Sequence, residues 1–253
     1  MPRLFDLLSE GSRKELIEEN RKLKKNAPDH PSRQRKHEQK TRRISETIQI
    51  PDFVAIDVET TGLNFKTDRI IEIGAVKFRQ GKPAEDFSTF INPGIPIPPT
   101  ITDLTGITDT DIADAPGFPD IEEKLLEFIG ANPLCGHQIE FDSSFLREEY
   151  KRLGKPAPGN PQLDTALLSR ILLDPAGRFS LKYVCGVLGV TLDNAHRALH
   201  DAKASGEAAA RLIPKLPELP LAVRQTIAAC APSSLFKQLI FQTHHHLRPE
   251  IIL

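Results

Sequence analysis

Two carboxylates, Asp57 and Glu59, stand two residues apart in a stretch that is otherwise apolar from Phe53 to Val58, and a turn follows at Gly62. Side chains alternate between the two faces of a strand, so both carboxylates emerge on the same face. Carboxylates this close repel each other unless a cation lies between them. Because Mg²⁺ is commonly held by one or two carboxylates and substrate phosphates, the stretch has the character of half a metal site. A strand with a solvated acidic face is the alternative interpretation.

Two more aspartates extend this pattern. Asp142 lies at the start of an expected helix, directly after a short apolar strand, and Asp201 lies in a later expected helix, five positions after His196. An aspartate at a helix start is usually a cap or a partner of the helix dipole, so neither residue indicates a site by itself. Their joint occurrence with the first carboxylate pair is what indicates one.

The acidic motifs together strongly resemble the DEDDh (DnaQ-like) family of 3′→5′ exonucleases, in the branch of the proofreading epsilon subunit of bacterial DNA polymerase III. The resemblance covers residues 51 to about 212. The matching pieces are Asp57-Val-Glu59-Thr-Thr-Gly, the segment from His137 to Leu146 with Asp142, and His196-Arg-Ala-Leu-His-Asp201-Ala.

This resemblance implies a set of site residues. Four carboxylates would hold two divalent cations, Mg²⁺ or Mn²⁺, and His196 would be the general base that takes a proton from the attacking water. Two cations about 3.5–4 Å apart can activate a water on one side of a phosphodiester and neutralise the leaving oxygen on the other. The implied metal ligands are Asp57, Glu59, Asp142 and Asp201. The implied substrate contacts are Thr60, Thr61, Gly62, Leu63, His137, Phe141 and Phe145.

The spacing between His196 and Asp201 predicts where the histidine lies. Five residues within one helix would place the two side chains about 140° apart, at 3.6 residues per turn. We therefore expect His196 in the loop before the helix, from which it can close over bound substrate. His200 is the nearest rival, but it directly precedes Asp201 and faces elsewhere on the helix.

The activity that the resemblance implies is metal-dependent hydrolysis of DNA from a 3′ end, single-stranded or frayed, with release of nucleoside 5′-monophosphates in proofreading or repair. One alternative is a 3′→5′ exoribonuclease of the same family. Another is a non-catalytic module that accompanies a polymerase or a clamp. The expected partners are a nucleic acid with a free 3′ end, with DNA favoured, and a polymerase subunit or a sliding clamp.

The order of the expected elements predicts an α/β fold of the ribonuclease H-like kind, a mixed sheet flanked by helices. Three consecutive strands with short links favour an antiparallel meander. Helices dominate the later part. Strands are expected over residues 53–58, 69–78, 85–91 and 134–137, and helices over 118–129, 141–153, 164–173, 180–188 and 197–213.

Composition bounds the rest. The 253 residues are 39% apolar and 26% charged, as in globular proteins. No apolar run approaches the length of a membrane span and no secretory signal is recognisable, so a cytoplasmic protein without a membrane partner is expected. Three cysteines without paired spacing do not indicate a disulfide framework or a thiolate zinc site.

Charge divides the chain into three expected parts. Residues 1–50 carry 13 Lys and Arg against 8 Asp and Glu, and the remainder carries 20 against 26, so an acidic body follows a basic arm. The predicted parts are a basic, mobile N-terminal extension over residues 1–47, an exonuclease domain over 48–213 and a helical C-terminal extension over 214–253. The arm is interpreted either as an electrostatic tether for nucleic acid or as a merely solvated extension.

Overall fold

The computed structural model describes residues 50–173, 179–193, 195–230 and 239. These belong to two compact units, of which Ile50–Leu212 contains the sheet. The other unit contains the 3-10 helix η1 (Ile213–Glu218) and helix α11 (Leu221–Cys230). The basic arm predicted over residues 1–47 lies outside the described residues. None of the helices described has both the length and the hydropathy that a membrane crossing requires.

Five strands form one sheet in the order β3-β2-β1-β4-β5. β1, β2 and β3 pair antiparallel, as the predicted meander requires, whereas β4 pairs parallel with both β1 and β5. The predicted mixed sheet is therefore confirmed. The strands are β1 (Phe53–Thr60), β2 (Ile70–Arg79), β3 (Lys82–Phe90), β4 (Leu134–Gly136) and β5 (Gln162–Asp164).

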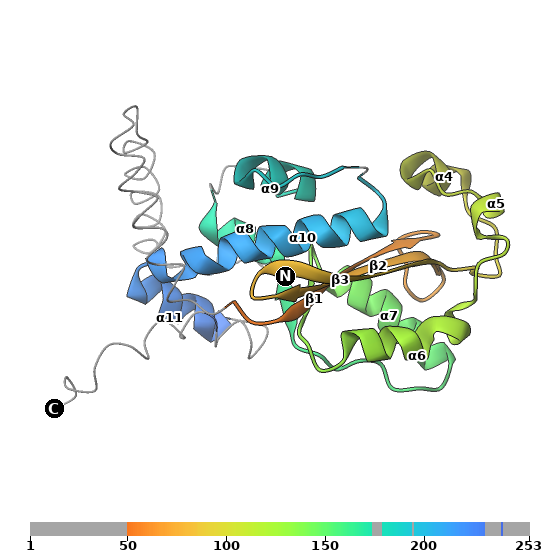
Figure 1. Ribbon diagram of the computed structural model, residues 1–253, viewed down its shortest axis with the longest axis horizontal. Coiled ribbons are helices and arrows are strands. Elements are labelled where there is room, and N and C mark those ends of the chain that lie inside the picture. The colour runs from red at the N-terminus through yellow and green to blue at the C-terminus, as the bar shows by residue number, and fades with distance from the viewer. Residues whose placement is uncertain (1–49, 174–178, 194, 231–238, 240–253) are drawn as a thin grey trace. The chain divides into compact units, whose positions relative to one another are not determined.

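Helices cover both faces of this sheet, as predicted. In Figure 1, α10 crosses one face, with α8 and α9 on the same side, while α6 and α7 lie on the other. The five expected helices are α6 (Phe118–Ile129), α7 (Glu140–Arg152), α8 (Thr165–Leu172), α9 (Leu181–Leu188) and α10 (Ala198–Leu212).

Three short elements were not predicted, and local chemistry explains why. Helix α4 (Pro99–Thr105) begins at the end of a proline-rich run, and proline suits a first helical turn although it interrupts other helical positions. Helix α5 (Asp109–Ile112) is a single turn held by a capping box between Thr108 and Asp111. Strand β5 has only three residues, too few to show a periodicity.

Strand β1 sends its alternate side chains to different layers. Val54, Ile56 and Val58 belong to the large apolar core that includes residues of α6 and α7. Ala55 points to the opposite face, where α10 lies. An added Cβ on Gly206 of α10 would lie 2.9 Å from the Cβ of Ala55. The carboxylate face of β1 is therefore the face that α10 covers.

Helix α10 approaches the sheet more closely than ordinary side chains would permit. An added Cβ on Gly206 would lie 2.2 Å from the ring of Phe78, which is buried and stacked on Phe53 at 4.9 Å between ring centroids. An added Cβ on Gly74 of β2 would lie 2.1 Å from the backbone nitrogen of Leu199. The helix axis is thus set by two positions at which only hydrogen fits.

We expect Gly206→Ala to lower the free energy of unfolding by about 1–3 kcal/mol, because the new methyl group overpacks against the buried ring of Phe78. Gly186→Ala is the matched control, since it also replaces a helical glycine but meets no atom within 4 Å. The control should leave stability unchanged or raise it by up to about 1 kcal/mol through helix propensity. Urea unfolding of both variants checks this, and equal shifts would contradict the packing argument.

Candidate active site

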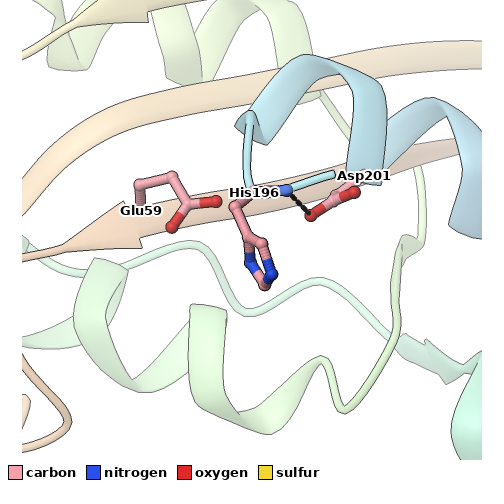
Figure 2. Close-up of side chains that lie close together, drawn as sticks. All are labelled: Glu59, His196 and Asp201. Atoms are coloured by element: carbon pink, nitrogen blue, oxygen red, sulfur yellow. Dashed lines mark hydrogen bonds between the residues drawn. The ribbon is translucent and has the colours of Figure 1, made fainter. Parts of the chain in front are cut away.

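Three side chains, one each from a strand, a loop and a helix, converge on the sheet face that α10 covers. Glu59 projects from β1, His196 lies in the loop before α10, and Asp201 lies in the first turn of that helix (Figure 2). One ligand atom of each lies within 4.8 Å of the others, which is the spacing of groups that can share a metal ion. The structure therefore brings together residues that are far apart in the sequence.

The backbone at His196 explains how the loop and helix combine. His196 adopts a φ of +67°, a left-handed conformation that is uncommon for residues other than glycine. Its backbone N–H donates to Oδ2 of Asp201 at 3.1 Å (Figure 2). This contact orients the Asp201 carboxylate and leaves the imidazole of His196 exposed. The predicted position of His196, in the loop before the helix, is confirmed.

Asp142 reaches the same region from the opposite layer. It lies in the first turn of α7 and its Oδ1 accepts the backbone N–H of Val58 at 3.0 Å. This hydrogen bond connects α7 to β1 at Val58, the residue between Asp57 and Glu59. Asp57 lies opposite Gly74 in the β1–β2 register, and Glu59 lies opposite Glu72.

The carboxylates are crowded and poorly hydrated, and their pKa values are raised. Burial raises the pKa of Asp57 well above its ordinary range, and the neighbouring Asp142, Asp201 and Glu59 raise it further. The pKa of Glu59 rises to about 7, mainly through burial and then through Asp201 and Glu72, with Arg197 opposing. Burial also raises the pKa of Asp142 and that of Asp201. Gathering these groups in ionised form is unfavourable unless positive charge is added.

An unsatisfied oxygen shows where that charge would go. Oδ1 of Asp201 is buried and has no hydrogen-bond partner among the described residues. A carboxylate oxygen in this state is costly unless a cation or a donor meets it. The carboxylate oxygens of this region are the donors that Mg²⁺ and Mn²⁺ prefer, and the nearby imidazole is left for another role. The site therefore fits the divalent cations that the sequence motifs imply.

The end of β1 and the turn after it hold four of the predicted substrate contacts. The Thr60 hydroxyl donates to the carbonyl of Gly62 at 2.6 Å, and the Thr61 hydroxyl accepts the backbone N–H of Arg69 at 2.9 Å. An added Cβ on Gly62 would lie 2.4 Å from the carboxylate of Asp68, so a side chain there would displace this carboxylate from its hydrogen bond with the backbone N–H of Asn64. Leu63 is 83% exposed, which is unusual for a leucine.

The remaining predicted contacts differ in what they can offer. The ring nitrogens of His137 already have protein partners, the Thr165 hydroxyl at 3.0 Å and the Phe179 carbonyl at 2.6 Å. Phe145 is fully buried in the core, whereas Phe141, packed on it at 5.0 Å between ring centroids, is 37% exposed. Substrate contact by all three stays a prediction, but only Phe141 presents an open ring surface.

Glu72, which none of the sequence motifs includes, connects β2 to the start of α10. This glutamate is buried and pairs at 3.0 Å with Arg197, the residue that directly follows His196. A glutamate within the apolar first half of the strand was the available signal, since the predicted meander also places β2 beside Glu59.

A second overlooked network holds the turn itself. Glu149 of α7 is buried and accepts Arg69 at 2.7 Å and Arg152 at 2.9 Å. Arg152 also donates to the carbonyls of Phe65 and Lys66, at 3.1 and 2.9 Å. The turn that carries Leu63 is thereby attached to the helix that carries Asp142.

Comparison with known proteins places this architecture. The family model described as Exonuclease (RNase_T) matches residues 54–209, more than half of the chain. "DNA polymerase III PolC-type" from Clostridium perfringens is 40% identical over 156 residues, which are 62% of this chain but 11% of that protein. The chain thus spans about a ninth of the length of that relative.

Two solved structures share the fold. The complex of Exonuclease X with 5′-overhanging duplex DNA is 24% identical, with a TM-score of 0.53 over 64% of this chain and 90% of that one. The zinc-bound E. coli Exonuclease I complex with single-stranded DNA is 19% identical, with a TM-score of 0.60 over 71% and 44% of the two chains. Together with the family match, these findings show that the chain belongs to the exonuclease family, and they confirm the resemblance of its motifs to the DnaQ-like exonucleases.

Proposed function

We propose that this domain is a metal-dependent 3′→5′ exonuclease that releases nucleoside 5′-monophosphates from the 3′ end of DNA. The observation that carries the proposal is the convergence of Glu59, His196 and Asp201 on one face of β1, with an unpartnered Asp201 oxygen in the described structure. Exonuclease-family membership supplies the reaction class. The polarity, the metal stoichiometry and the substrate are the parts that need testing.

The carboxylates have the role of holding the cations. Asp57 and Glu59 from β1, Asp142 from α7 and Asp201 from α10 offer oxygens from three elements, so the ligands are fixed by the sheet and both helix layers. When bound, two such cations supply Lewis acidity for the attacking water and neutralise charge on the phosphate and the leaving oxygen. Burial first, and the neighbouring carboxylates second, raise the pKa values of these carboxyls, and a bound cation would offset both effects.

His196 has the role of general base. Its imidazole is exposed beside Glu59 and Asp201, so it can reach a water that approaches the phosphate from solvent. A neutral imidazole nitrogen accepts a proton near neutral pH, which suits proton removal from water. The backbone hydrogen bond to Asp201 restrains the residue that carries the base.

DNA is the proposed substrate because of what the relatives bind. The Exonuclease I structure named above is a complex with single-stranded DNA, and the Clostridium protein is a DNA polymerase. A polymerase is accordingly the proposed partner, with a sliding clamp as the alternative. Leu63 and Phe141 offer apolar surface for the bases at the 3′ end. RNA is the alternative substrate, since 2′-hydroxyl recognition depends on local contacts.

We expect Asp57→Asn and Asp142→Asn each to lower the rate of nucleotide release by roughly 10³-fold or more, because several kcal/mol of charge stabilisation would be lost with the cations. Asp86→Asn is the control, an exposed aspartate on the edge strand β3 that is not one of the four assigned ligands. The assay follows 3′-labelled and 5′-labelled strands with Mg²⁺, with Mn²⁺ and with chelator, on DNA and RNA of the same sequence.

Each outcome of that assay has a distinct meaning. Wild-type rates in the two Asn variants would refute the assigned ligands, and release from the 5′ end would refute the polarity. Faster digestion of RNA than of DNA would show that RNA, and not DNA, is the preferred substrate. Strand binding without cleavage under any metal condition would favour the non-catalytic accessory module.

A second prediction concerns stability in the absence of metal. The Glu59 carboxyl has an ordinary pKa of 4.5 and a folded pKa of about 7, so its charged form is the disfavoured one in the fold. The destabilisation is absent below pH 4.5, grows as pH rises and is complete above pH 7. We expect the thermal midpoint of the metal-free domain to fall across this window, to fall less in Glu59→Gln, and to recover when Mg²⁺ is added. Identical pH profiles for the two proteins would contradict this assignment.

A further inference from the structure

The loop that carries His196 is held by three consecutive contacts. The N–H of His196 donates to Asp201, the guanidinium of Arg197 pairs with Glu72, and the N–H of Ala198 donates to Oε2 of Glu72 at 3.1 Å. Two of the three contacts therefore end on one carboxylate. That carboxylate belongs to β2, not to the loop or to α10 itself.

The pair between Glu72 and Arg197 has the geometry of a fixed connection. Nη2 of Arg197 lies 3.0 Å from Oε1 of Glu72, and Nε lies 3.3 Å from both carboxylate oxygens. The side chain of Glu72 is only 3% exposed, and the guanidinium of Arg197 lies 5.2 Å from the ring centroid of Phe90. A planar guanidinium that is held by a carboxylate through two of its nitrogens and lies over an aromatic ring has little orientational freedom.

The strand that supplies Glu72 also sets the height of the helix. Gly74 lies two residues along on the same face of β2, and its missing side chain lets the backbone of Ala198 and Leu199 approach. Across the strand pair, Gly74 lies opposite Asp57 and Glu72 lies opposite Glu59. The start of α10 is therefore placed by the two β2 positions that face the β1 carboxylates.

We propose that Glu72 and Arg197 are positioning residues of the hydrolytic reaction, whose ion pair fixes the His196 loop and the first turn of α10 against Glu59. The proposal rests on the proposed function of the site. The left-handed backbone of His196 supports it, because a non-glycine residue persists in that conformation only when its surroundings impose it. Misplacement of a catalytic group by about 1 Å can lower a rate by about 100-fold.

The test compares Arg197→Gln, Arg197→Lys and Glu72→Gln with the control Glu122→Gln. Glu122 on α6 is also a buried carboxylate whose side chain is 3% exposed, and it pairs with Lys155 away from the carboxylate face of β1. We expect Arg197→Gln and Glu72→Gln to lower kcat by about 10–100-fold while KM changes by less than about threefold. The control should keep wild-type kcat even if its thermal midpoint falls.

Arg197→Lys separates positioning from simple neutralisation of charge. Lysine keeps the positive charge but cannot form the forked contact, so we expect kcat to stay well below wild type. Full recovery of kcat in this variant would overturn the proposal. In the double variant Glu72→Gln/Arg197→Gln, we expect a loss no larger than that of either single variant, because the two residues act as one unit. Multiplied losses would also overturn it.

Amide hydrogen exchange in the metal-free protein gives a readout that does not depend on activity. We expect faster exchange at residues 196–201 in Arg197→Gln and unchanged exchange there in the Glu122→Gln control. Unchanged exchange in both would refute the positioning role. Wild-type kcat in all variants would refute it while leaving the proposed function intact. Absence of metal-dependent nucleotide release by the wild-type domain would refute the proposed function itself.

Discussion

The close approach of helix α10 to the sheet is the constraint on which the rest of the site depends. Glycines at positions 74 and 206 let helix and strand backbones come nearer than side chains would permit. A helix held one methyl group farther away would carry Asp201 away from Glu59. The site is therefore a consequence of packing between layers as much as of the acidic residues themselves, and glycines that take no part in the chemistry determine its dimensions.

Electrostatics opposes this assembly, and the surrounding structure sustains it. Asp57, Glu59, Asp142 and Asp201 share a region with little water, and Glu72 adds a fifth carboxylate opposite Glu59. The protein compensates only part of this charge, through the pairing of Glu72 with Arg197 and the backbone N–H groups that reach Asp142 and Asp201. The remaining negative charge would be balanced by the proposed cations.

Sequence reasoning succeeded where periodicity or a motif carried the information. The meander, the buried fourth strand and the five longer helices follow from apolar patterning, and the loop position of His196 follows from helical spacing. The three-residue strand β5 and the helices α4 and α5 were not predicted, because tertiary contacts and caps, and not periodicity, specify such short elements. The two interior carboxylates, Glu72 and Glu149, escaped because each looks like an ordinary glutamate until the fold supplies its arginines.

The place of α10 at the end of the sheet-bearing unit affects how the site comes into being during synthesis. A nascent chain leaves the ribosome from its N-terminus, so β1 and α7 are available while α10 is still being made. A polypeptide that stops before residue 196 retains three of the four carboxylates and lacks both the histidine and the final aspartate. Fragments and half-made chains are thus without the complete constellation, and the proposed hydrolytic activity would require a completed domain.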